Sequence, residues 1–256
     1  MALRCFADTD TAMTNVLIAF ALKEEFAPWR RRHAFRAVPG SPARVAHFGS
    51  TDVYAALIGA GAVDAHWLAG LIEQVEPKFA LVTGVAAGLK PQWWPGDVLV
   101  AQTVCGPDGK ESIAGDAELI HRALECGAKP APVLITLPRI ARTAEEKRSL
   151  ASLGDAADME SLVVMKEWSE LGIPALALRV ILDPVEMPMT IDFEAAMDAH
   201  GQVRVTRVLA QLLRRPQLLP DLLRLARQNH RSTALLARFL DRFFQRASPY
   251  SRQLAR

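Results

Sequence analysis

The sequence is poor in cysteine and contains no long apolar run. Its cysteines, Cys5, Cys105 and Cys126, form no CxxC pair and no Cys/His ligand spacing, which argues against a disulfide framework and against a zinc site. No segment approaches the roughly 18 apolar residues of a membrane span, and no basic region leads into a long apolar stretch at the start. We therefore expect a cytoplasmic protein that is neither secreted nor membrane-spanning.

Acidic residues become scarce beyond residue 200. The segment 201–256 carries twelve arginines against two aspartates, a net charge of +10, although the whole chain of 256 residues carries only +2. Such a block is typical of a solvated helix face, but it can also mark an anionic partner or a membrane surface. The segment 1–12 shows no strand or helix period. We expect a disordered leader at 1–12, one domain at 13–200, and an Arg-rich helical tail at 201–256 packed on or extending that domain.

Short apolar runs alternate with helical patterns along residues 13–200. This alternation, without internal repeats, predicts an α/β fold of three layers, in which helices flank a central mixed sheet. In such sheets, ligands bind at the carboxyl ends of the strands. The predicted strands are 16–21, 43–48, 53–58, 78–83, 97–103, 133–136 and 175–182.

Six short motifs follow one another along the chain: 21–25 (ALKEE), 59–61 (GAG), 83–89 (TGVAAGL), 95–100 (PGDVLV), 158–161 (DMES) and 179–183 (RVILD). Their order and spacing resemble the nucleoside phosphorylase superfamily, and most closely its methylthioadenosine/S-adenosylhomocysteine nucleosidase branch. The resemblance covers about residues 16–183 and implies cleavage of a purine N-glycosidic bond.

The resemblance implies a role for each carboxylate. Such cleavage passes through an oxocarbenium-like ribose, so the site must protonate the leaving base, hold the sugar hydroxyls and place a nucleophile. Asp183 matches the proton donor, Glu160 the ligand of the ribose hydroxyls, and Glu25 the carboxylate that activates water in the hydrolytic branch. The other expected substrate-binding residues are Gly61, Gly84, Val85, Ala86, Ile140 and Met159.

Each assignment has a structural alternative. Asp183 could cap a turn before Pro184, and Glu160 and Glu25 could be ordinary acids in the first turn of a helix. Arg179, inside an apolar strand, needs a buried partner such as Glu160 or Glu25, and is expected to be structural. No cofactor and no metal are expected, although phosphate is a candidate co-substrate.

Three positions depart from the family pattern. Val85 stands where many relatives have a serine that contacts phosphate or water, and Leu182 stands where a serine precedes the catalytic aspartate. Ile140 replaces an aromatic residue expected under the base. The departures point to an altered substrate or, in a competing interpretation, to a nucleoside-binding protein without catalysis.

The segments after Asp183 resemble the hopanoid-biosynthesis-associated phosphorylases. These segments are 187–188 (MP), 198–201 (DAHG) and 207–227. The resemblance implies phosphorolysis of an adenosylated hopane with release of adenine; the alternative is hydrolysis of methylthioadenosine or S-adenosylhomocysteine. A lipidic substrate would explain a peripheral contact of 221–244 with the inner membrane, the apolar side being supplied by leucines and phenylalanines.

The same Arg-rich helix could instead be a solvated packing helix or an oligomer contact. Because the relatives are homo-oligomers, we expect at least a dimer, with Trp67, Trp93 and Trp94 as a candidate contact patch. A nucleic-acid partner is not expected.

Overall fold

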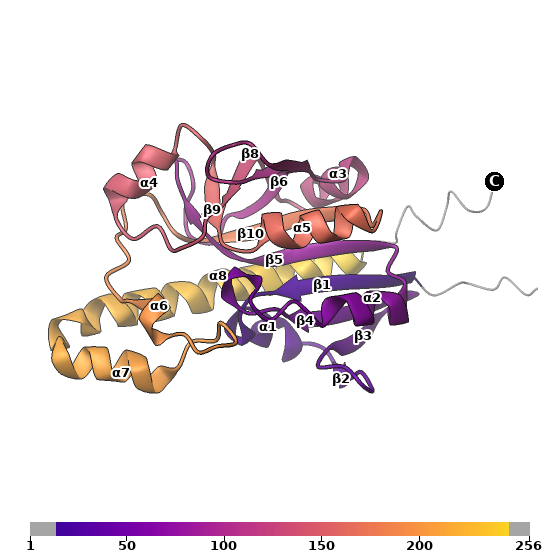
Figure 1. Ribbon diagram of the computed structural model, residues 1–256, viewed down its shortest axis with the longest axis horizontal. Helices are drawn as coiled ribbons and strands as arrows, with labels where there is room; N and C mark the ends of the chain where they lie inside the picture. The colour runs from indigo at the N-terminus through magenta and orange to yellow at the C-terminus, as the bar shows by residue number, and fades with distance from the viewer. Residues whose placement is uncertain (1–13, 246–256) are drawn as a thin grey trace, which may run out of the picture.

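The computed structural model describes residues 14–245, so the expected leader at 1–12 lies outside the described residues. One mixed sheet runs through the molecule, with β1 at its centre between the parallel neighbours β4 and β5 (Figure 1). From β5, pairing continues through β9, β8, β6 and β10 and returns to β5, which closes this half of the sheet into a ring. The strands are β1 (Thr14–Phe20), β2 (Arg36–Ala37), β3 (Arg44–Phe48), β4 (Thr51–Leu57), β5 (Phe79–Gly88), β6 (Val98–Cys105), β7 (Ser112–Ala114), β8 (Lys129–Thr136), β9 (Ala156–Asp158) and β10 (Ala175–Asp183).

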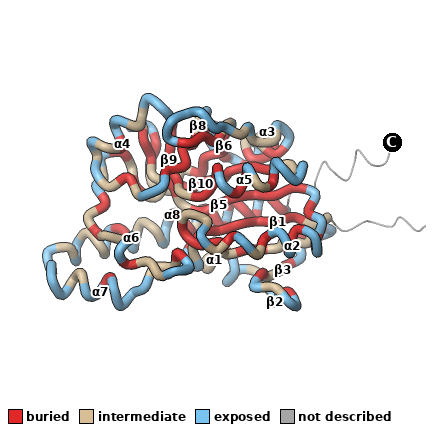
Figure 2. Tube along the Cα trace, in the orientation of Figure 1, coloured by how far each residue is buried: buried red, intermediate tan, exposed pale blue. Residues whose placement is uncertain are grey.

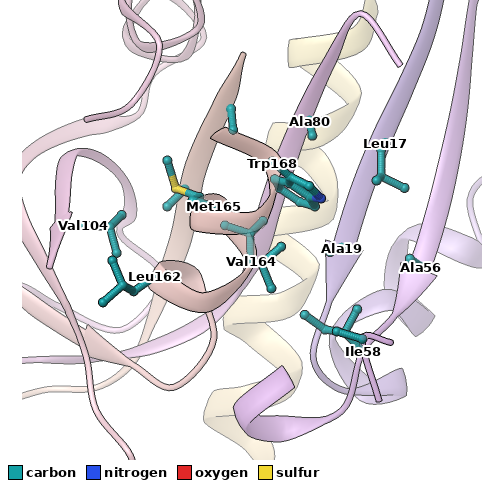
Figure 3. Packing of buried hydrophobic residues seen from close by; sticks show 14 of the residues in the cluster. Leu17, Ala19, Ala56, Ile58, Ala80, Val104, Leu162, Val164, Met165 and Trp168 are labelled. Carbon is teal, nitrogen blue, oxygen red and sulfur yellow. The ribbon is translucent and has the colours of Figure 1, made fainter. Parts of the chain in front are cut away.

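Helices cover both faces of this sheet. On one face, α2 and α5 share an apolar cluster with β1, β4 and β5; Figure 3 shows Trp168 of α5 beside Ala80 of β5. On the other face, α1, α3 and α8 enclose a second apolar cluster. The expected three-layer α/β fold is confirmed. The helices are α1 (Lys23–Arg30), α2 (Leu68–Val75), α3 (Ala117–Glu125), α4 (Ala144–Leu150), α5 (Ser161–Glu170), α6 (Phe193–Ala196), α7 (Val205–Arg214) and α8 (Leu219–Gln245), with short 3-10 turns η1 (Ala60–Ala62) and η2 (Pro216–Leu218).

The second half of α8 belongs to the core. Its apolar residues recur at helical spacing, and this apolar face packs against β10 and α1. Asp241 accepts hydrogen bonds from Trp29 Nε1 at 2.9 Å and Arg32 Nε at 2.7 Å, and so ties α8 to α1. The buried residues of this half include Leu236, Phe239, Leu240, Phe243 and Phe244.

The expectation that the leucines and phenylalanines of 221–244 form a membrane-facing side is wrong for these five residues, because the sheet and α1 already cover them. Helical periodicity showed an apolar face but not what covers it. A different part of the tail is exposed: Figure 2 shows α7 largely in the colours of exposed and intermediate residues, at the end of the molecule away from the sheet. Within the described residues, no helix is both long and apolar enough to cross a bilayer.

The candidate oligomer patch also changes. Trp93 packs in the core cluster under α5, so it cannot serve as a contact residue. Trp94 is 66% exposed, and Trp67 is half-buried. A contact patch made of all three tryptophans is therefore excluded, and an oligomer contact remains an expectation that rests on Trp94 and Trp67.

Candidate active site

The carboxyl ends of β1, β5 and β10 meet at one edge of the sheet, because these three strands are parallel neighbours. A cavity of about 510 Å³ opens at this edge. Residues from the strand ends line one end of it, and residues from the chain after β10 line the other. Of the residues expected from the sequence, the cavity is lined by Glu25, Val85, Ala86, Ile140, Met159, Glu160 and Asp183.

Arg179 is the central cation of the strand-end region. It is 1% exposed, and its Nη2 lies 2.6 Å from Asp158 Oδ2 and 3.2 Å from Glu160 Oε2. The same nitrogen donates to Ser161 Oγ at 3.0 Å. The expected buried partner Glu160 is therefore present, and Asp158, which sequence reasoning missed, is the closer one. Charge-assisted hydrogen bonds of an arginine with carboxylates are strong, so this network fixes the start of α5 against β10.

Glu25 lies beside this network at the start of α1. Its two oxygens accept hydrogen bonds from the N–H of Val85 at 2.8 Å and of Leu22 at 3.0 Å. Burial raises the pKa of the Glu25 carboxyl above its usual range, while the charge of Arg179 and the backbone donors oppose that rise. A carboxylate with a raised pKa in a cavity is suited to accept a proton near neutral pH.

Gly84 makes this approach of Glu25 to β5 feasible. A Cβ at this position would lie 2.6 Å from Glu25 Oε1 and 2.8 Å from Arg179 Nη1, closer than packing allows. Its φ of +149° also lies in the region that favours glycine. Arg179 Nη1 is buried and has no hydrogen-bond partner among the described residues. The backbone of β5 thus lies directly against the charged groups.

Glu160 occupies the N-cap position of α5, and its side chain reaches back to the loop after β4. Its Oε1 accepts the N–H of Gly61 at 2.9 Å. Burial, reinforced by Asp158 and Glu25 and opposed by Arg179, raises the pKa of Glu160 to about 7. Met159 lines the cavity next to it. The sequence placed Gly61, Met159 and Glu160 in one site, and the structure brings them together.

Asp183 ends β10, on the side of the cavity opposite β1. It is buried, and burial raises its pKa to about 6, although Lys147 lowers it by its charge and its hydrogen bond. Lys147 of α4 is itself fully buried and donates to Asp183 Oδ2. Sequence reasoning missed Lys147, because a lysine in a helix that also carries Glu145, Glu146 and Arg148 looks solvated.

The three departures from the family pattern all lie at the cavity. Val85 contributes its backbone N–H to Glu25, and Leu182 and Ile140 line the wall. The N–H of Ile140 donates to Glu194 Oε1 at 2.7 Å, which ties the loop after β8 to α6. Aliphatic side chains thus stand where a hydroxyl or an aromatic ring was expected, and this makes the cavity less polar.

The far end of the cavity is almost wholly apolar. It is built by α6, α7, the start of α8 and the connecting segments, all of which follow β10 in the chain. Ile191, Ala196 and Val208 form the buried centre of a small apolar cluster behind this wall. The apolar residues lining this end include Met189, Phe193, Met197, Val203, Val205, Val208, Leu222, Leu223 and Leu225.

Solved structures share this fold. The chain superposes on a 5′-methylthioadenosine/S-adenosyl homocysteine nucleosidase from Campylobacter jejuni with a TM-score of 0.68 and 18% identity, covering 91% of this chain and 99% of that chain. A futalosine hydrolase from Helicobacter pylori strain 26695 gives a TM-score of 0.66 and 17% identity, covering 90% of this chain and 97% of that chain. No curated protein matches the chain by sequence.

A family model identifies the chain more directly. The model described as the phosphorylase superfamily matches residues 15–214, which include every expected site residue and reach the end of α7. Together with the buried acids gathered at the strand ends, this match shows that the chain belongs to the phosphorylase superfamily and is an enzyme of the nucleoside phosphorylase and nucleosidase class.

Proposed function

We propose that the protein cleaves the N-glycosidic bond of an adenine nucleoside whose 5′ position carries a large apolar group, and that it releases adenine. The observation that carries this proposal is one cavity with two chemically different ends. Buried carboxylates line the end at the strands, and aliphatic side chains line the end formed by the segments after β10. A cavity of about 510 Å³ is of the size that binds a substrate larger than a simple nucleoside.

The charged end supplies the groups that the reaction needs. Asp183 donates a proton to the leaving base, which becomes a neutral leaving group. Glu160, held by Gly61 and Arg179, accepts hydrogen bonds from the ribose hydroxyls, and Met159 packs against the sugar. Positioning and proton donation of this kind lower the barrier to the oxocarbenium-like transition state.

Water is the nucleophile that the geometry favours. Glu25 already accepts the Leu22 and Val85 N–H groups, donors that a phosphate would need. The lining of the cavity also holds Glu24, Asp158, Glu160 and Asp183, so its field disfavours a phosphate dianion. Glu25 then removes a proton from the water while the water oxygen attacks the anomeric carbon.

Phosphorolysis, which the resemblance to the hopanoid-associated branch implies, is the second candidate. The observation in its favour is Arg139, a cation in the lining of the cavity, whose Nη2 lies 2.5 Å from Glu146 Oε1. To bind phosphate, this guanidinium would exchange Glu146 for the anion. Dependence of adenine release on phosphate distinguishes the two candidates.

The apolar end supports an adenosylated polycyclic lipid, such as an adenosylhopane, as the substrate. Each methylene group moved from water into such a wall contributes about 0.8 kcal/mol to binding. The methyl group of methylthioadenosine would contact only a small part of this wall. The proposed preference is therefore for a 5′ substituent with many ring or chain carbons.

Peripheral membrane contact through the exposed hairpin of α7, η2 and the start of α8 is part of this proposal. Val205, Leu209, Leu213, Leu219 and Leu223 are 46–86% exposed there, and exposed arginines surround them. Apolar and basic side chains on one surface suit an anionic lipid headgroup layer. Val205 and Leu223 also line the cavity, so its apolar end opens toward this surface.

The test is incubation of the purified protein with adenosine, methylthioadenosine, S-adenosylhomocysteine and a detergent-solubilised adenosylated polycyclic lipid, each with and without phosphate. Adenine is measured by chromatography. We expect the highest kcat/KM for the lipid-linked nucleoside, without dependence on phosphate. Absence of adenine from all four nucleosides would overturn the proposed function, and strict phosphate dependence would overturn the choice of water.

A further inference from the structure

Lys147 is a fully buried lysine at the edge of the candidate site, and no motif points to it. It lies in α4, whose N-terminus is capped by the Thr143 hydroxyl that accepts the Glu146 N–H at 3.0 Å. The neighbouring Arg148 is exposed and pairs with Glu186. Of the two basic residues of α4, Lys147 is therefore the one whose side chain is buried. A lysine is almost never fully buried without a partner, so its contacts are informative.

Three acceptors surround the Lys147 side chain. Its Nζ donates to Asp183 Oδ2, to the carbonyl oxygen of Met187 at 2.7 Å and to that of Pro184 at 3.2 Å. An ammonium has three N–H donors, and each one finds an acceptor here. Because two of the acceptors are backbone groups of the turn that follows Asp183, the same side chain holds both the carboxylate and its supporting loop.

We propose that Lys147 is a positioning residue that holds Asp183 toward the leaving base and makes it a stronger proton donor. This inference rests on the proposed function. Removal from water favours the neutral form of the Asp183 carboxyl, which would make an isolated buried acid reluctant to release its proton. The ammonium of Lys147 stabilises the carboxylate that forms on release, so its effect is greatest as the proton leaves.

The step balances with water as its one co-reactant. The bond between the anomeric carbon and N9 of the purine breaks, its electron pair moves into the purine ring, and the oxygen of the attacking water bonds to the anomeric carbon. The proton on the Asp183 carboxyl moves to N7, so the base leaves neutral and Asp183 becomes a carboxylate paired with Lys147. The proton that Glu25 takes from the attacking water restores the charge balance of the site, and exchange with solvent resets both acids.

Other groups near Asp183 do not replace this cation. The adjacent part of α8 presents Ser232 and Gln228, which are neutral, to the carbonyl oxygens of Ile181 and Leu182. Arg179 is bound to Asp158 and Glu160 at the ribose end, and Arg139 is paired with Glu146. Burial raises the pKa of Asp183; among the described residues, Lys147 is the one whose side chain opposes that rise, and the Asp183 backbone adds a hydrogen bond that also lowers the pKa.

The experiment compares Lys147→Gln, which removes the charge, with Lys147→Arg, which keeps it, across pH 5–9. For the adenine nucleoside, Lys147→Gln should lower the maximal kcat about tenfold and move the alkaline limb of the pH profile upward by about 1 to 3 pH units. A nitrophenyl riboside, whose leaving group needs no proton, serves as the matched substrate. Its turnover by Lys147→Gln should fall less than about twofold.

Equal losses on both substrates, with an unchanged alkaline limb, would reduce Lys147 to a structural role and overturn the inference. Lys147→Arg should keep the wild-type limb; a shift as large as that of Lys147→Gln would also contradict it. If the wild type releases no base from any nucleoside, the proposed function fails first. The inference is then decided by carbon-13 NMR titration of the Asp183 carboxyl, whose signal is assigned by its absence from the spectrum of Asp183→Asn. The pKa of Asp183 must be higher in Lys147→Gln than in the wild type.

Discussion

The two ends of the cavity are built by different principles. At the charged end, Arg179, Glu160, Glu25 and Asp183 are buried, and they are joined by hydrogen bonds to each other, to Lys147 or to backbone groups. The apolar end consists of side chains from helices that are themselves partly exposed. A change at the charged end disturbs several partners at once, whereas a change at the apolar end alters little besides the shape and polarity of the wall.

This difference separates reaction from substrate choice. In the proposed function, residues of the sheet edge break the N-glycosidic bond, and residues after β10 select the 5′ substituent of the nucleoside. The four changes below test that separation in order of the expected size of their effects.

Replacement of Asp183 by Asn should have the largest effect. The amide has no proton to give at neutral pH, so kcat for adenine release should fall by about 100-fold or more, the usual contribution of proton donation. KM should change little, since the wall of the cavity stays intact. Near-normal turnover, measured by adenine chromatography, would remove Asp183 from the reaction.

Replacement of Glu160 by Gln tests the charged end through stability. Because the pKa of Glu160 is raised to about 7, the folded state favours the neutral form of this acid. The stability that results is fully present below the unfolded pKa near 4.5, and it is lost as the pH rises through 7. The wild type should therefore lose up to roughly 3 kcal/mol between pH 5 and 8.5 that Glu160→Gln does not lose. Denaturant unfolding at both pH values measures the difference; parallel pH dependence of the two proteins would contradict it.

Replacement of Leu222 by Gln tests the apolar end. A polar amide in this partly buried part of the wall should lower kcat/KM for a nucleoside with a large apolar 5′ group about tenfold, in line with the loss of part of a leucine's transfer free energy. Adenosine should be cleaved within about twofold of the wild-type rate. Leu219→Gln, one turn earlier and outside the lining of the cavity, is the matched control. Equal losses on both substrates would place Leu222 outside the substrate-selecting wall.

The smallest expected effect concerns the exposed surface beside the apolar end. Leu213 is 86% exposed on α7, and Leu213→Glu adds a negative charge where an anionic bilayer would lie. Sedimentation with anionic vesicles should show binding weakened about fivefold, because each charge near such a surface contributes about 1 kcal/mol. Leu153→Glu, 49% exposed after α4, is the control. Negligible pelleting of the wild type itself would exclude the membrane contact.

The sequence predicted much of the charged end and little of the apolar end. The resemblance in motif order assigned Glu25, Glu160 and Asp183 to one site, because short motifs can be recognised in the sequence without knowledge of packing. Lys147 was missed because only tertiary packing distinguishes an inward lysine from a solvated one. Asp158 was likewise missed as the partner of Arg179, and the three-residue strand β9 that carries it is too short for a periodic pattern.

The arrangement of α8 has a consequence for how the chain reaches its fold. The helix follows every other described element, yet Phe239, Leu240 and Phe243 fill the space against strands that were synthesised first. The part of this sheet face that α1 and α3 do not cover therefore stays exposed until the final turns of α8 have been synthesised. A nascent chain stalled before residue 236 should therefore be bound by chaperones that recognise exposed apolar surface.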